Sequence, residues 1–374
     1  MKNLKVFVVL LVLSLLLINS AFADDLKIQF AGFAFRGDDA LISKNYPRTL
    51  AISREIVANQ RGILDVALAN KIKNVKLKNG QIVTEKLANF GDGSLTLACC
   101  FDTELVSIEQ HDDGFKLVID LGAQALLFDY SQMRVVASYP VMVELIDYLS
   151  EEPDEALITS RIRDLLLTNK YGANLFDDFS EVLENVEIKQ SYGHAMKVTN
   201  VLVEEKAFDH LPPQFKEDKA NFKMFVAQNF GKFLSENQGV SILPYTKDGA
   251  ISNKMALRLS NAKVYELAIP EPQFAIELTV RGFKKVCTEE KASGSCWVYG
   301  AYTKIRISQP ALGKVYLDER VQNAVSKIIP RSQKTRQDWP SYQNSLLALF
   351  NKVTKEFSTE RKYKAVRKVV KKCS

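Results

Sequence analysis

Residues 274–281 read FAIELTVR, a stretch in which an apolar side chain recurs at every second position from Phe274 to Val280. Side chains of a strand point alternately to its two faces, so this period of two predicts a strand with one buried face. A polar loop at residues 288–295 separates it from a second strand-like stretch that ends at Ile307. A turn at residues 309–313 leads into a third. The sequence therefore predicts three consecutive strands joined by two turns.

Helices are predicted on both sides of these strands. Residues 218–237 place apolar side chains on one helical face, and Gly239 follows as a stop signal. Asp338 can cap a last helix that has Pro340 in its first turn. The apolar face of that last helix runs from Tyr342 to Phe357.

The first half of the chain repeats this order of elements. Its predicted elements are a strand at 26–35, a helix after Pro47, strands at 95–108 and 115–121, a hairpin at 126–138, and helices at 153–167 and 173–183. The turn region at 126–136 aligns with residues 304–316 in element order, with low residue identity. We therefore predict an α/β (α+β) protein of two tandem small mixed-sheet domains, residues 24–188 and 189–357, with helices packed on the sheets.

Residues 1–23 have the features of a secretory signal peptide. Lys2 and Lys5 precede an apolar run, and the small-residue triplet that ends at Ala23 completes the expected order. The alternative is a membrane anchor, for which the apolar run is short. Cleavage after Ala23 predicts a secreted, periplasmic protein. The absence of a cysteine at the cleavage point predicts that the chain is not lipidated.

The net charge of +6 is unevenly distributed. Lys2 and Lys5 contribute +2, residues 358–374 contribute +6, and the body between them is therefore about −2. A folded body of this charge does not predict a nucleic-acid-binding surface. The basic residues of this C-terminal tail are Arg361, Lys362, Lys364, Arg367, Lys368, Lys371 and Lys372.

Two interpretations of the tail stay open. Tyr363, Val366 and Val370 form a narrow apolar strip at helical spacing, so the tail could contact anionic lipid, lipopolysaccharide or an acidic partner. The alternative is a solvated, frayed chain end.

The five cysteines are interpreted against an oxidising compartment. Cys287 and Cys296 each end a strand-like run, and a hairpin would bring them within bridging range, so we predict a disulfide bond between them. Two free thiols are the alternative. Cys99 and Cys100 are neighbours that a strand directs to opposite faces, and their pairing, like that of Cys373, stays open.

We find no residue pattern that predicts an enzyme. The three histidines, His111, His194 and His210, lie far apart, and no spacing resembles a zinc site. His111 is followed by Asp112-Asp113-Gly114, which is better explained as a hairpin turn than as a metal ligand set. No nucleophile elbow, Walker loop or dinucleotide-binding fingerprint is present in the sequence. We therefore expect no catalytic residues, no cofactor and no metal.

The element order, together with Ile305-Arg306-Ile307 and Gly313-Lys314-Val315, resembles a periplasmic α/β module. That module is known from the amino-terminal domain of the Tol translocation protein, the curli secretion subunit, a penicillin-binding-protein activator lipoprotein and the middle domain of the flagellar H-ring protein. Its Asp-x-x-Thr-Gly hairpin core is replaced by residues 309–312 in the second half, while the first half keeps only Asp129.

The resemblance implies a non-enzymatic scaffold or adaptor protein for the assembly of an envelope complex, such as a secretion or flagellar-ring complex. It implies protein–protein interaction with other envelope proteins, including a homo-oligomeric ring, and no small-molecule substrate. The alternatives are a periplasmic binder of glycan or lipid, and a hydrolase with an unrecognised site.

Overall fold

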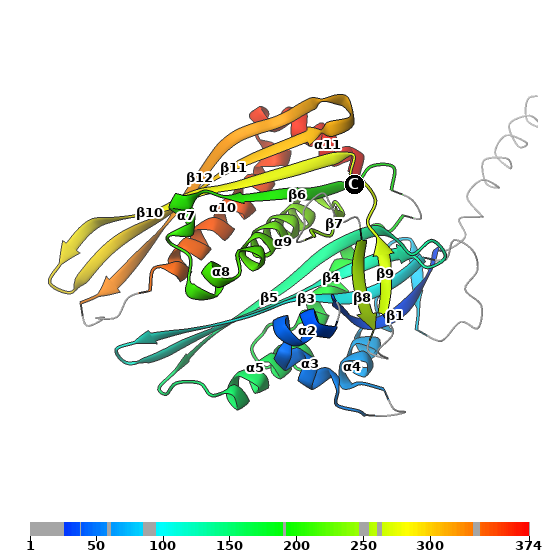
Figure 1. Cartoon of the computed structure of the whole chain (residues 1–374), viewed down its shortest axis with the longest axis horizontal. Helices are drawn as coiled ribbons and strands as arrows, with labels where there is room; N and C mark the ends of the chain where they lie inside the picture. The colour runs from blue at the N-terminus through cyan, green and yellow to red at the C-terminus, as the bar shows by residue number, and fades with distance from the viewer. Residues whose placement is uncertain are drawn as a thin grey trace, which may run out of the picture.

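The computed structural model describes residues 26–37, 39–57, 61–84, 95–189, 192–246, 254–259, 264–331 and 337–373. The predicted signal peptide lies outside these residues. The elements, shown in Figure 1, are β1 (Leu26–Arg36), α2 (Asp39–Asn45), α3 (Pro47–Ser53), α4 (Ile63–Ile72), β2 (Gly80–Val83), β3 (Leu95–His111), β4 (Gly114–Asp129), β5 (Arg134–Leu149), α5 (Glu155–Leu167), α6 (Leu175–Asn185), β6 (Met196–Val203), α7 (Glu205–Phe208), α8 (Pro213–Glu217), α9 (Lys219–Gln238), β7 (Ile242–Leu243), β8 (Lys254–Leu259), β9 (Val264–Ala268), β10 (Phe274–Lys291), β11 (Gly294–Gln309), η3 (Pro310–Leu312), β12 (Lys314–Pro330), α10 (Trp339–Thr359), η4 (Arg361–Tyr363) and α11 (Lys364–Cys373).

The protein has two mixed sheets with helices packed on them, as the sequence predicts. One sheet contains the order β2-β1-β3-β4-β5, and the other has the order β7-β6-β10-β11-β12. In each, an antiparallel run of three long strands lies beside a strand that pairs with it in parallel. The matching orders confirm the predicted repeat of elements. We call the part built on the first order the first lobe and the part built on the second order the second lobe.

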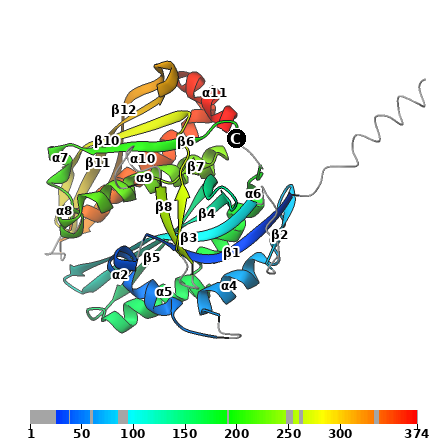
Figure 2. The same cartoon turned by 45° about the vertical axis from the view of Figure 1, so that its right-hand side comes forward.

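The lobes stack as alternating layers of helix and sheet. In Figures 1 and 2, helices α2–α6 cover the outer face of the first sheet, and α9 and α10 lie between the two sheets. The helices of the first lobe are placed by local signals. Asp154 and Asn174 each accept hydrogen bonds from backbone N–H groups in the first turns of α5 and α6. Their apolar faces bury Ile162 and Phe179 completely against the strands.

The hairpin β8–β9 belongs to the first sheet although it lies late in the chain. Its two strands, β8 and β9, pair with each other in antiparallel order. β8 pairs with the end of β1, and β9 joins β5 through Arg134 and Ala268, so the strands close on themselves at this end. Leu257 and Leu267 are fully buried there beside Cys100 and Leu126 of the first lobe. The two halves of the chain are therefore interlocked.

The second lobe is centred on α9 and α10. Asp218 caps α9 by accepting hydrogen bonds from Ala220 N and Asn221 N, and Gly239 ends the helix in the left-handed region at φ 67°. Helix α10 runs to Thr359, and α11 follows after one short turn. The C-terminal segment is therefore an ordered helix that packs against α10 and β12, and it is not a frayed end.

We predict that the β8–β9 hairpin contributes strongly to the stability of the first lobe. Leu257→Ala removes a fully buried side chain, so it should lower the free energy of unfolding by about 2–5 kcal/mol. Val264→Ala, at a half-exposed position on the same hairpin, should change it by less than about 0.5 kcal/mol. Urea unfolding of both variants measures this. Equal, small losses would mean that the hairpin is not part of the folded unit.

Candidate functional site

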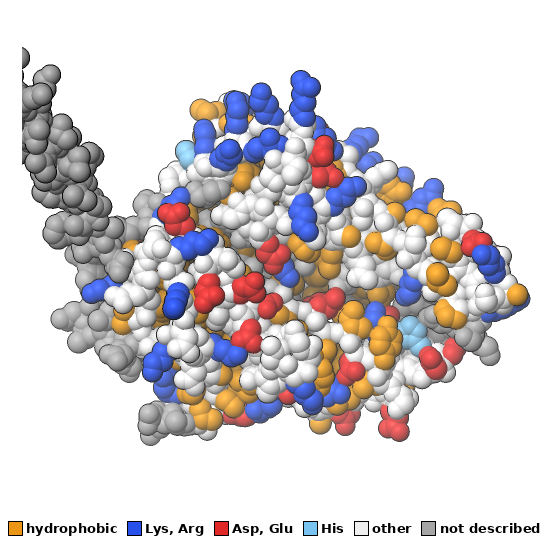
Figure 3. Space-filling view, turned by 180° about the vertical axis from the view of Figure 1, so that it is seen from behind, with side chains coloured by type: hydrophobic (Ala, Val, Ile, Leu, Met, Phe, Trp, Pro, Cys, Tyr) orange, Lys and Arg blue, Asp and Glu red, His pale blue; other side chains and the backbone are white. Residues whose placement is uncertain are grey.

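The strongest candidate for a binding site is a cleft between the two lobes. Three adjoining hollows run along it, with cavity volumes of about 300, 30 and 540 Å³ from the end near Arg36 to the end near His111. Leu105 lines the first two hollows and Lys116 lines the last two, so neighbouring hollows share a wall residue. Figure 3 shows Asp and Glu side chains along the hollowed line between the lobes.

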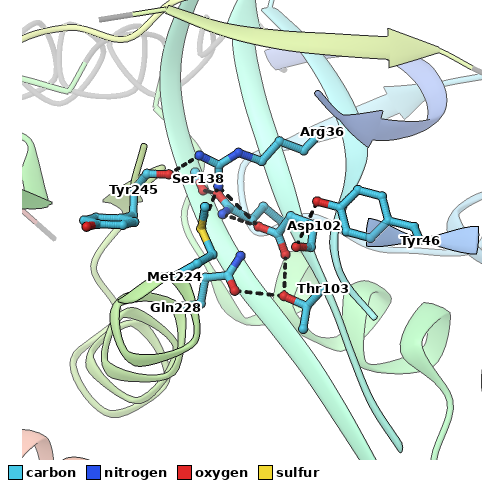
Figure 4. A network of polar contacts seen from close by, with 9 residues as sticks. Arg36, Tyr46, Asp102, Thr103, Ser138, Met224, Gln228 and Tyr245 are labelled. Atoms are coloured by element: carbon cyan, nitrogen blue, oxygen red, sulfur yellow. Dashed lines mark hydrogen bonds and ion pairs between the residues drawn. The ribbon is translucent and has the colours of Figure 1, made fainter. Parts of the chain in front are cut away.

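A buried polar network closes one end of the cleft (Figure 4). The guanidinium of Arg36, at the end of β1, donates a hydrogen bond to the backbone carbonyl of Tyr245 in the second lobe. Its Nη1 lies 4.0 Å from Asp102 Oδ2 and 3.3 Å from Met224 Sδ of α9. Both charged side chains are buried. Arg36 therefore joins a strand of the first lobe to two segments of the second.

The network continues through the neighbouring strands and into α9. Asp102 Oδ2 accepts a 2.7 Å hydrogen bond from Gln124 Nε2, and Ser138 Oγ donates to Gln124 Oε1. Thr103 Oγ1 lies 2.8 Å from Gln228 Oε1 of α9 and donates to it. Burial raises the pKa of Asp102 above its ordinary value, against the opposing effect of Arg36. The carboxylate is thus held by several partners in a site that largely excludes water.

The middle of the cleft contains two acidic side chains that lie next to helix α10. Asp120 of β4 lies directly opposite Glu144 of β5, and Gln343 Nε2 of α10 reaches Asp120 Oδ2 at 3.5 Å. Burial and the Glu144 carboxylate raise the pKa of Asp120 to about 7. The hollow of about 30 Å³ here holds roughly two water molecules. This part of the cleft is a contact between the lobes, too narrow for a substrate.

The open end of the cleft carries charged side chains from both lobes. Glu109, which is 1% exposed, lies 3.8 Å from Lys116 Nζ and 3.7 Å from His111 Nε2. Lys327 of β12 faces them from the second lobe, where burial and the charge of Lys116 lower its pKa. Burial raises the pKa of Glu109, and the charge of Lys116 opposes that shift. The charges are mixed, so this end does not select anions or cations by net charge alone.

Exposed apolar side chains flank these charges. Ile146 and Tyr148, near the end of β5, expose 43% and 72% of their surface and line the hollows of the cleft. Trp339 and Phe215 of the second lobe line the narrow hollow opposite Ile146. An exposed aromatic side chain beside an apolar one at the mouth of a cleft is typical of a binding surface.

The histidines that the sequence singled out do not meet. His111 lies at the cleft mouth, while the ring of His194 contacts Phe274 and that of His210 contacts Tyr342. Within the described residues, no group of three or more His, Cys, Asp or Glu side chains is placed to bind a metal ion. Across those same residues, no helix combines the length and the apolar character that crossing a bilayer requires.

The predicted bridge between Cys287 and Cys296 is not formed in the structure, where both are free thiols. The hairpin is present, but its strands continue to Lys291 and from Gly294, so the predicted loop is mostly strand. Cys287 lies opposite Trp297 and Cys296 lies opposite Glu289, with a bulge between the two pairs. The register therefore places the thiols diagonally instead of face to face.

The remaining cysteines lie in three separate cores. Cys99 and Cys100 point to opposite faces of β3, as a strand requires, and each is buried in a different apolar cluster. Cys373 is buried in the core of the second lobe. All three are free thiols in the structure.

The basic tail residues lie outside the cleft. Arg361, Lys362, Lys364, Lys368, Lys371 and Lys372 are exposed, whereas Arg367 donates to the carbonyls of Phe357 and Glu360 at 3.2 and 3.0 Å.

Sequence reasoning missed the charged residues of the cleft, although a signal for them exists. The apolar alternation at residues 115–121 leaves Lys116 and Asp120 on the other face of the same strand. Those positions are the ones that line the cleft. The partners Glu144 and Gln343 come from distant segments, which the sequence does not place beside them.

Comparisons with known proteins leave the family of the chain open. No protein-family model matches the sequence. No curated protein matches it. Among solved structures, a protein described as a homolog of the neuraminyllactose-binding hemagglutinin, from Helicobacter pylori, is 14% identical and covers 48% of this chain and 89% of its own, with a TM-score of 0.28.

Two further bacterial structures overlap to a similar extent. A hypothetical protein from Chlamydia trachomatis is 10% identical, covers 46% of this chain and 98% of its own, and has a TM-score of 0.26. A minor lipoprotein from Acinetobacter baumannii is 8% identical, covers 44% of this chain and 92% of its own, and has a TM-score of 0.20. These TM-scores are too low to support an inference from these structures about the fold or the function of this chain.

We predict that the buried Arg36–Asp102 contact within the first lobe stabilises the folded protein. Arg36→Met leaves a buried carboxylate without its cation, so it should lower the free energy of unfolding by about 3–5 kcal/mol. Adding Asp102→Leu to that variant should restore much of the loss, because no unpaired charge remains. Urea unfolding of both single variants and the double variant measures the coupling. Additive losses would contradict a direct interaction.

We predict that Asp120 makes a pH-dependent contribution to the free energy of unfolding. Its folded-state pKa of about 7 exceeds the ordinary value of 3.8, so the folded state binds its proton more tightly. The contribution is therefore fully present below about pH 4 and is lost as the pH rises through 7. Asp120→Asn should remove this contribution. The difference in the free energy of unfolding between pH 5 and pH 8 should therefore become smaller by on the order of 1–2 kcal/mol. Unfolding curves at both pH values measure this, and an unchanged difference would contradict it.

Proposed function

We propose that the protein is a non-enzymatic adaptor of a bacterial envelope that binds a segment of a partner protein in the cleft between its lobes. The observation that carries the proposal is the exposed pair Ile146 and Tyr148, of which Ile146 lines the narrow hollow and Tyr148 lines the mouth of the cleft. Large apolar side chains gathered at the rim of a groove lose water favourably when a partner covers them. The predicted signal peptide supports a periplasmic location for that partner.

The shape of the cleft supports a polypeptide over a small ligand. Its two wider hollows, of about 300 and 540 Å³, are separated by the narrow acid pair at Asp120 and Glu144. A small molecule is normally enclosed by one well-formed pocket. A partner loop can instead contact the mouth, where Tyr148 supplies apolar area and the exposed Asp113 supplies a polar partner. Such a mixed surface is usual for transient protein interfaces.

We predict that Tyr148 contacts the partner directly. A photoreactive phenylalanine analogue at Tyr148, activated in intact cells, should give a crosslinked product with another envelope protein. The matched control is Leu312 on η3, which is 69% exposed and lines none of the three hollows. That position should give no such product. Mass spectrometry of the purified products identifies what is bound.

Other outcomes of the same experiment would replace the proposal. Equal yields at both positions, or none at either, would remove the evidence for an adaptor at the cleft. A product with glycan or lipid would favour the binder alternative, and a product with a second copy of the chain would favour the homo-oligomeric ring. In a separate activity assay, turnover of an envelope substrate that a single carboxylate substitution abolishes would favour a hydrolase.

A further inference from the structure

The last helix has one face in the protein core and the other in solvent. Val366, Val369, Val370 and Cys373 are at most 3% exposed and pack in the core of the second lobe. The opposite face carries lysines, and residues 361–373 contain seven Lys or Arg and no Asp or Glu. In Figure 3 the basic side chains gather along the upper edge of the molecule, where Figure 1 places α11.

Burial of the apolar face of α11 limits how this helix can bind a membrane. An amphipathic helix that anchors a protein inserts its apolar face between lipids. Here that face already contacts the protein, so insertion would require the helix to leave its own core. The exposed basic face is what remains for binding. It can act only from the headgroup side, through charge.

Most of the basic residues are not used within the protein. Arg367 is bound to backbone carbonyls at the end of α10, and Lys362 lies 3.9 Å from Glu356. Lys364, Lys368, Lys371 and Lys372 are exposed and form no ion pair with any part of the chain that the structure describes. Four like charges on one short helix repel one another, so an anionic partner would stabilise them.

The kind of residue indicates the kind of anion. A site that recognises one phosphate or carboxylate usually presents arginine, whose planar group binds with two hydrogen bonds. On α11 itself the four unpaired residues are all lysines, whose mobile point charges suit a diffuse anionic surface, and the exposed Arg361 lies before the helix on η4. An exported protein meets such a surface at a phospholipid bilayer.

We infer that the basic face of α11, made of Lys364, Lys368, Lys371 and Lys372, binds bilayers that contain anionic phospholipid headgroups. The contact is peripheral and depends on charge, without insertion of the helix. No residue of α11 lines the hollows between the lobes, so the cleft stays open to a protein partner on a bound molecule. The inference goes beyond the adaptor proposal and does not depend on it.

The test is sedimentation of the purified chain from residue 24 onward with two kinds of vesicle. One is pure phosphatidylcholine, and the other contains roughly one third phosphatidylglycerol, so the two differ in surface charge. The protein should sediment only with the anionic vesicles. Binding should fall steeply from about 0.1 M to about 1 M salt, as the screening length shortens from about 10 to 3 Å. Equal binding to both vesicles, or none to either, would overturn the inference.

Two matched sets of variants distinguish the contribution of α11 to vesicle binding from the effect of the protein's overall charge. Substituting all four lysines, Lys364→Gln, Lys368→Gln, Lys371→Gln and Lys372→Gln, should weaken binding about a hundredfold or more, because each lysine contributes roughly fivefold. The control removes four exposed lysines elsewhere, by Lys27→Gln, Lys73→Gln, Lys76→Gln and Lys206→Gln, and should lose less than about fivefold. Equal losses would overturn the assignment to α11.

Two further measurements complete the test. The quadruple arginine variant of α11 should keep vesicle binding, because it keeps the charge, and all variants should keep the wild-type melting temperature within about 2 °C. If the anionic vesicles fail to bind while an acidic envelope protein is retained through the same four lysines, the partner of α11 is that protein and the lipid assignment is wrong.

Discussion

The relative position of the two lobes depends on the buried contact of Arg36 with Asp102 and Tyr245. Burying a charged pair costs several kcal/mol for each ion, and the cost is offset only when good geometry and further hydrogen bonds satisfy both groups. Those bonds come from Gln124 beside Asp102 and from the carbonyl of Tyr245 in the second lobe. The pair is therefore satisfied only when the lobes are docked. The interlocked β8–β9 hairpin adds apolar burial at the same end, so the lobes are joined firmly there and meet more loosely at the other.

The character of the cleft follows from that asymmetry. Near Arg36 the polar groups are buried and paired. Towards His111 they become more exposed. In the middle of the cleft the pKa of Asp120 is raised to about 7, and at the mouth Tyr148 is open to solvent. A binding site at the mouth is therefore built on strands whose other ends are fixed, an arrangement that keeps a recognition surface in shape. The basic face of α11 lies outside the cleft, so the two proposed contacts do not compete.

Local pattern predicted the elements whose burial follows one period. The strict alternation at 274–281 predicted part of β10, and the apolar face from Phe222 to Leu234 predicted α9 with its stop at Gly239. The repeated order of elements along the chain was predicted as well, and the structure adds that the two sheets share a strand order. Local sequence pattern failed where a contact with a residue far away in the sequence determines the structure. Asp338 was expected to cap α10, but its carboxylate instead binds Lys285 and the Tyr299 hydroxyl. The β8–β9 hairpin joins a sheet formed more than a hundred residues earlier, and the bulge near Cys287 shifts the register of the thiols. The cleft itself, which brings Asp120 to Gln343, has no local signature.

The central claim is that the Arg36 contact fixes the lobes and so preforms the cleft. Spin labels at Tyr148 and Ile328, both exposed and one on each lobe, report the distance across the open end. The labels are introduced after Cys287→Ser and Cys296→Ser remove the thiols that are not fully buried. The account predicts one narrow distance distribution for the otherwise wild-type protein and a broadened one after Arg36→Met. A broad distribution in the wild-type background, or a narrow one that Arg36→Met leaves unchanged, would contradict it.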